Sequence, residues 1–143
     1  VLTGGEGQME GEIHETIADL DLEGQVHRLG RIPWWDLAAI LRQAHGLGFP
    51  SRFEGFGAPV IEAMARGCPV IAADATALPE VVGDAGVVVP ARDASALADA
   101  VNALIADPKR MRAMGEAGIE RVKGHFNWEK AVEEIIAVYR RFL

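Results

Sequence analysis

The chain has 143 residues, and 50% of them are hydrophobic, which is enough for one domain with a core of its own. Its 14 Lys and Arg residues against 21 Asp and Glu residues give a formal net charge of −7, so we do not expect a partner among nucleic acids or anionic membranes. A single cysteine, Cys68, excludes an intramolecular disulfide framework and a multi-cysteine zinc site, and we interpret its side chain as buried packing. Because the sequence has neither a signal-peptide pattern nor an apolar run long enough to span a bilayer, we expect a cytoplasmic protein without a transmembrane segment.

Short apolar runs alternate with amphipathic helical stretches along the chain. Strands are predicted for residues 1–3, 26–29, 47–49, 70–73 and 87–89. Helices are predicted for residues 8–20, 34–44, 59–66, 109–123 and 128–142, and for a stretch that ends at residue 106 and is capped by Asp93 or Ser95. Residues 74–80 are predicted to form a loop. The alternation predicts an α/β fold, with a parallel sheet covered by helices on both faces and with ligands bound beyond the C-terminal ends of the strands.

The segment of residues 54–62, with the sequence EGFGAPVIE, is the most informative part of the chain. Glycine allows a backbone to approach a ligand closely, and a helix N-terminus offers unpaired N–H groups and a partial positive charge to a phosphate. Pro59 fits the first helical position, and Glu62 would lie about one turn further in. Because a carboxylate repels phosphate, Glu54 and Glu62 are better suited to accept hydrogen bonds from hydroxyl groups on either side of it. A ligand with hydroxyls, then phosphates, then more hydroxyls is a nucleotide sugar.

The surrounding residues extend this pattern into a longer string. Residues 50–57 have the sequence PSRFEGFG, and residues 62–73 have the sequence EAMARGCPVIAA. The string resembles the retaining glycosyltransferases of family 4, which have the GT-B fold and carry two glutamates separated by seven residues. The likeness continues through residues 78–86 and on to Trp128 and Tyr139. It covers nearly the whole chain, but only the C-terminal, donor-binding half of the family, so it implies the Rossmann-like C-terminal half of a GT-B fold.

The resemblance implies a role for each residue of the motif. Glu54 is implied to contact the hydroxyls of the donor sugar near the reacting carbon, and Glu62 is implied to hold the ribose hydroxyls of the nucleotide. The simpler alternatives are a solvated loop charge for Glu54 and a favourable interaction with the helix dipole for Glu62. Backbone N–H groups of the turn are implied to bind the sugar and the diphosphate, although the same turn would also suit an ordinary entry into a helix. These N–H groups belong to Gly55, Phe56, Gly57 and Ala58.

A second loop, residues 30–33, follows a predicted strand at the edge of the sheet. In the resembled family this loop touches the nucleotide base, largely through backbone atoms, which makes Arg31 and Ile32 candidate donor-binding residues. Arg31 has the alternative of an ordinary surface arginine. No metal and no cofactor are implied, because a helix end and basic residues take the place of a metal and the nucleoside-diphosphate sugar is a substrate.

Two features depart from the family pattern. The C-terminal half of the family normally begins earlier, with a first strand and a loop whose arginine and lysine clamp the diphosphate. We therefore interpret residues 1–143 as one donor-binding domain truncated at its N-terminal edge and lacking the N-terminal acceptor domain. In addition, Gly48 lies within a predicted strand, where glycine costs about 0.5–1 kcal/mol relative to alanine. Whether the chain is catalytically active by itself is left open.

The function that these residues predict is transfer of a sugar from a nucleoside-diphosphate donor to a hydroxyl acceptor, with retention of the anomeric configuration. A rival from another class is a non-catalytic module that binds nucleotide weakly or pairs with another chain, a second copy included, through an exposed edge beside residues 1–3. A second enzymatic rival is a sugar epimerase with the GT-B fold, and the PSRFEGFG string argues against it. The nucleotide base, the sugar and the acceptor all stay open.

Overall fold

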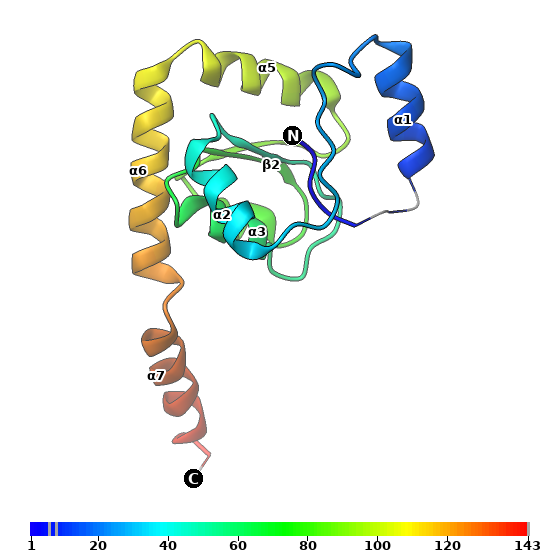
Figure 1. The fold of residues 1–143 in the computed structure, drawn as a ribbon. Coiled ribbons are helices and arrows are strands. Elements are labelled where there is room, and N and C mark those ends of the chain that lie inside the picture. Colours follow the sequence, from blue (N-terminus) through cyan, green and yellow to red (C-terminus); the bar gives the residue numbers. More distant parts are fainter. Residues whose placement is uncertain (6, 8, 143) are drawn as a thin grey trace. The chain divides into compact units, whose positions relative to one another are not determined.

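The computed structural model describes residues 1–5, 7 and 9–142 (Figure 1). These residues form two compact units, Val1–Leu37 and Ala38–Leu143, and each unit is described by itself. The candidate motif and the sheet that carries it both belong to the second unit.

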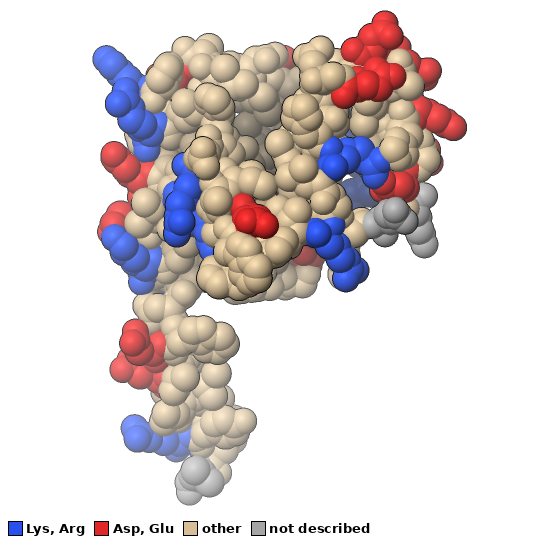
Figure 2. Space-filling view, viewed as in Figure 1, with Lys and Arg blue, Asp and Glu red and all other residues tan. Residues whose placement is uncertain are grey.

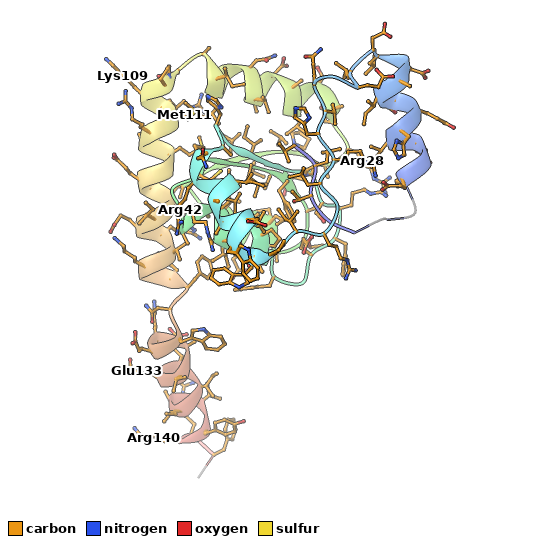
Figure 3. The ribbon with its side chains drawn as sticks, viewed as in Figure 1. Arg28, Arg42, Lys109, Met111, Glu133 and Arg140 are labelled. Carbon is orange, nitrogen blue, oxygen red and sulfur yellow. The ribbon has the colours of Figure 1, made fainter. Side chains whose placement is uncertain are left out.

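The first unit contains helix α1 (Glu10–Asp19) and a parallel bridge between Leu2 and Arg28. The Leu2 N–H donates to the His27 carbonyl at 2.8 Å, and the Leu29 N–H donates to the Leu2 carbonyl at 3.0 Å. The strands predicted at residues 1–3 and 26–29 are thus reduced to one bridge. Figure 3 shows the Arg28 side chain directed toward α1, where it forms an ion pair with Glu10.

Helix α2 (Trp34–Gln43) begins in the first unit, directly after Pro33, and ends in the second. The second unit then contains a three-stranded parallel sheet in the order β1 (Leu47–Phe49), β2 (Val70–Asp74) and β3 (Val87–Pro90). Leu47 lies opposite Val70, and Ile71 lies opposite Val87. The parallel pairing confirms the predicted α/β class.

The remaining helices connect and cover these strands. They are α3 (Ala58–Met64), α4 (Leu78–Val82), α5 (Ala94–Ile105), α6 (Pro108–His125) and α7 (Trp128–Tyr139). Asp93 caps α5, because its carboxylate accepts a hydrogen bond from the Ala96 N–H at 2.9 Å. The predicted loop at residues 74–80 was wrong in its second half, where α4 begins at Leu78. The predicted end of α6 at Gly124 was also wrong, since the Phe126 N–H still donates to the Val122 carbonyl.

The sheet lies between α5 on one side and α3 on the other (Figure 1). On the α5 side, Ile71, Val89 and Leu104 form a buried cluster, and Met111 of α6 packs against it with its side chain directed inward (Figure 3). The side chains of α3 and α4 include the largest fully buried ones, such as Met64 and Leu78. Burying a side chain of this size stabilises the fold by roughly 1.5–3 kcal/mol.

Helix α7 carries an unburied apolar surface. The exposed fractions are 85% for Trp128, 55% for Ile135 and 67% for Tyr139. Figure 2 shows uncharged atoms along one side of α7 and charged side chains gathered on the other. Within the described ranges, no helix is both long enough and apolar enough to cross a membrane.

Helix α6 packs tightly against the end of α3 through two glycines. A Cβ atom at Gly115 would overlap the Gly67 carbonyl oxygen, and one at Gly118 would lie 3.2 Å from the Met64 Cβ. Gly67 itself has a φ of +71°, which ends α3 and which glycine adopts without steric cost. The close approach of these backbones holds α3, and with it Glu62, against α6.

We predict that Gly115→Ala lowers the free energy of unfolding by about 1–3 kcal/mol, because the added methyl group forces α6 away from Gly67. The matched control is Gly124→Ala in the same helix, where an added Cβ meets nothing within 4 Å. This control should gain about 0.5–1 kcal/mol from helix propensity. Urea unfolding of both variants measures the difference, and equal effects of the two substitutions would contradict the close packing.

Candidate functional site

The motif segment connects the C-terminal end of β1 to α3. Helix α3 begins at Ala58, so Pro59 is its second residue rather than the predicted first. Gly57 is the N-cap and has a φ of +86°, in the left-handed region that favours glycine. A Cβ atom at this position would lie 2.9 Å from the Leu78 Cδ2, so the turn also lies directly against α4. Both constraints support glycine at the end of the EGFG sequence.

The backbone of Glu54 is held by the side chain of Thr76. The Glu54 N–H donates to the Thr76 Oγ1 at 2.9 Å, and the Thr76 hydroxyl donates to the Glu54 carbonyl at 2.9 Å. Thr76 has a φ of +48°, a conformation that costs a non-glycine residue on the order of 1–3 kcal/mol. Sequence reasoning assigned no role to this residue, and no periodicity or motif could have found a contact between residues 22 positions apart.

The side chain of Phe56 rests on the C-terminal end of α6. Its ring meets the Phe126 ring edge to face, with 6.0 Å between centroids. The Arg121 guanidinium lies 5.9 Å from the centroid of the same Phe126 ring. Arg121 also donates through Nε to the Val81 carbonyl at 2.8 Å and through Nη2 to the Glu80 carbonyl at 2.6 Å, which caps the end of α4. The Phe56 side chain therefore packs against the end of α6.

Glu62 is the fifth residue of α3, about one turn from its start as predicted, and it is exposed. Its main-chain carbonyl accepts a hydrogen bond from the Arg66 Nη1 at 2.7 Å. Glu54 is half-buried. In the part of the chain that the structure describes, neither carboxylate is engaged in an ion pair or a hydrogen bond. Both are thus available to accept hydrogen bonds from a ligand.

The N–H groups of the turn are also unoccupied by other described residues. The first N–H that donates within this stretch is that of Val60, to the Gly57 carbonyl at 2.9 Å. Pro59 has no N–H to offer. Four consecutive donors are therefore available between the two glutamates. They belong to Gly55, Phe56, Gly57 and Ala58.

Arg31 and Ile32 lie in the first unit, after the bridge between Leu2 and Arg28. The Arg31 side chain covers Gly5, where an added Cβ would lie 2.8 Å from the Arg31 Nε. Ile32 is half-buried. Their contact with the nucleotide base stays a prediction.

Cys68 is buried, with 2% of its surface exposed, as the sequence suggested. Burial raises the pKa of its thiol to about 11, because the charged thiolate is poorly solvated there. A thiol of this kind is a poor nucleophile at neutral pH, so the chemistry of the site does not depend on it.

The comparisons with known proteins agree with this geometry. The family described as "Glycosyl transferases group 1" matches residues 1–121. The chain belongs to this family. It is 36% identical over 135 residues to the MMP alpha-(1->4)-mannosyltransferase of Mycolicibacterium hassiacum, covering 92% of this chain and 33% of that protein. It is 34% identical to the D-inositol 3-phosphate glycosyltransferase 1 of Catenulispora acidiphila, covering 90% of this chain and 31% of that protein.

Solved structures of group 1 glycosyl transferases and related proteins have the same fold. The sucrose-phosphate synthase of Thermosynechococcus elongatus has a TM-score of 0.86 and 34% identity, covering 99% of this chain and 37% of that one. The C-terminal domain of the group 1 glycosyl transferase LpcC of Francisella tularensis has a TM-score of 0.75 and 28% identity, covering 84% of this chain and 63% of that one. These matches confirm the predicted resemblance to the C-terminal half of a GT-B glycosyltransferase. The chain spans about 33% of the first curated relative.

We predict that Cys68 in the native chain resists an aromatic disulfide reagent at pH 8. With a pKa of about 11, only about one thiol in a thousand is ionised at that pH, and the side chain is buried as well. In urea the thiol regains its ordinary pKa of about 8.5 and should react within minutes. The absorbance of the released thiolate measures both rates. Because the folded state keeps this proton, the same shift lowers stability as pH rises from about 8.5 toward 11.

Proposed function

We propose that this chain is the donor-binding half of a retaining glycosyltransferase that uses a nucleoside-diphosphate sugar. The observation that carries the proposal is the turn between β1 and α3, where two carboxylates flank four N–H groups and none of these has a partner among the described residues. This order of groups complements the hydroxyls of a sugar, a diphosphate and the hydroxyls of a ribose. HepE of Anabaena, which is 25% identical with a TM-score of 0.86 over 98% of this chain, was solved in complex with UDP-glucose.

In the proposed reaction, the bond between the anomeric carbon and the diphosphate oxygen breaks while a bond to the acceptor hydroxyl oxygen forms. The electron pair of the broken bond leaves with the diphosphate, which takes up the proton that the acceptor hydroxyl loses. Glu54 orients the sugar and faces the positive charge that develops at the anomeric carbon. The N–H groups of residues 55–58 stabilise the negative charge on the departing diphosphate. Glu62 anchors the ribose by accepting hydrogen bonds from its hydroxyls.

The proposed mechanism needs no metal, because backbone amides and cationic side chains neutralise the leaving group. The family resemblance implies that an arginine and a lysine take part in this neutralisation. Arg31 and Ile32 are proposed to contact the nucleotide base. The acceptor site is proposed to lie in an N-terminal domain, which the length of the curated relatives accommodates.

A second candidate function is association without turnover. The exposed apolar side chains of α7, with Trp128 at 85% and Tyr139 at 67% exposed, favour it. The chain would then bind nucleotide weakly or pair with another chain, including a second copy of itself.

We predict that this chain binds one of UDP, GDP and ADP, and that Glu62→Gln weakens this binding by roughly 10- to 100-fold, as expected for loss of hydrogen bonds to a charged group. The control is Glu116→Gln, which removes an exposed glutamate on α6 outside the candidate site. Calorimetric titration measures all three proteins. Equal affinity of the Glu62 variant would contradict the ribose role, and binding to none of the nucleotides would favour association without turnover.

A further inference from the structure

We infer that Thr76 is a positioning residue, which fixes Glu54 for the donor sugar without touching the nucleotide. The inference rests on the proposed function and assigns a role to a residue of the loop that follows β2. Three observations carry it, namely the two hydrogen bonds of the Thr76 hydroxyl, its backbone conformation, and the separate anchoring of the rest of the motif.

The hydroxyl of Thr76 forms a hydrogen bond with each of the two main-chain polar groups of Glu54. It accepts from the N–H at 2.9 Å and donates to the carbonyl oxygen at 2.9 Å. Neither group has another hydrogen-bond partner among the residues that the structure describes. Only a short side chain with one donor and an acceptor on the same atom makes both bonds at once, which limits this function to threonine and serine. The contact fixes the peptide groups on both sides of the Glu54 Cα, and therefore the direction in which its carboxylate leaves the loop.

The backbone at Thr76 does not by itself favour threonine. Its φ of +48° lies in the left-handed region, which is unfavourable for a β-branched side chain and open to glycine. Glycine would adopt this backbone conformation at a lower cost than threonine. What threonine adds is the hydroxyl and its two bonds to Glu54.

The nucleotide end of the motif is held in another way. Gly57 lies against Leu78, and α3 is fixed by the contact of its C-terminal end with Gly115 and Gly118 of α6. Glu62 stands on this helix, with no described contact to Thr76. Removing the Thr76 hydroxyl should therefore disturb recognition of the sugar more than recognition of the nucleotide, because Glu62 and three of the four N–H donors are held independently of it.

Three variants separate the hydroxyl from the backbone. Thr76→Ser keeps the hydroxyl, Thr76→Val removes it at nearly constant volume, and Thr76→Gly removes it while relieving the positive φ. Calorimetry gives the dissociation constants for three pairs, UDP and UDP-glucose, GDP and GDP-mannose, and ADP and ADP-glucose. The ratio within the pair that binds is the readout. Hydrogen exchange of the Glu54 amide, followed by NMR, reports the contact directly, and thermal unfolding reports stability.

We expect Thr76→Val and Thr76→Gly to weaken binding of the nucleotide sugar by about three- to tenfold, as for the loss of one or two neutral hydrogen bonds. Binding of the free nucleotide should be weakened less, because only the Gly55 N–H of the four donors belongs to a peptide group that Thr76 holds. The Glu54 amide should lose its protection in both variants. Thr76→Ser should keep the ratio and the protection of the wild type. Thr76→Gly should unfold at a higher temperature than Thr76→Val, because both lose the same hydrogen bonds and only glycine relieves the positive φ. An equal change of the ratio in two variants of different stability distinguishes positioning from a purely structural role.

An unchanged ratio in both variants without a hydroxyl would overturn the inference, as would equal weakening of nucleotide and nucleotide sugar. In either case the proposed function survives if the wild type binds a nucleotide and Glu62→Gln weakens that binding. If the wild type binds none of the three pairs, both the proposed function and the inference fail.

Discussion

Because β1 and β2 run parallel, with Phe49 opposite Ala72, the chain leaves both strands at the same edge of the sheet. The glycine-rich turn and the loop of residues 75–77 therefore emerge side by side, although 22 positions separate Glu54 from Thr76. This pairing creates the place where a threonine hydroxyl can reach the backbone of the motif. A shift of one residue in the register would exchange the two buried faces of β2 and move the two loops apart. The candidate site is in this sense a property of the strand pairing.

The motif is held in place by main-chain hydrogen bonds, close glycine contacts and aromatic packing. Among the described residues, none of these contacts involves the carboxylate of Glu54 or Glu62. Glu54 is held through its peptide groups, and Glu62 contributes only its carbonyl oxygen to the contact with Arg66. A salt bridge to either carboxylate would fix it more firmly, but a ligand hydroxyl would then have to compete with a charged partner. Anchoring the backbone avoids this competition and still orders the side chains before a ligand arrives, which reduces the entropy lost on binding.

Local sequence signals predicted most of the second unit and less of the site. The bounds of β1 agree with the prediction because an apolar run is flanked by Gly46 and Pro50, and the β2 run follows Gly67 and Pro69 in the same manner. Helix α4 was missed because it has five residues, too few to display a helical period, and because Pro79 suggested a break. Gly124 was taken as a helix end although it is tolerated inside α6, where nothing lies near it. Thr76 was missed because the parallel pairing of β1 and β2, and not closeness in the sequence, brings it to Glu54.

The C-terminal end of α6 also holds the motif in place, through contacts separate from those of Thr76. Arg121 caps α4 through the carbonyls of Glu80 and Val81, and its guanidinium also lies over Phe126, whose ring meets Phe56. The loop after β2 and the glycine-rich turn are thus both tied, through α4 and through Phe56, to the last turns of one helix. Since α4 directly follows the Thr76 loop, Arg121 restrains the far end of the segment that begins with the Glu54 contact. The motif has two anchors of different chemistry, and neither of them makes a described hydrogen bond or ion pair to the carboxylate of Glu54 or Glu62.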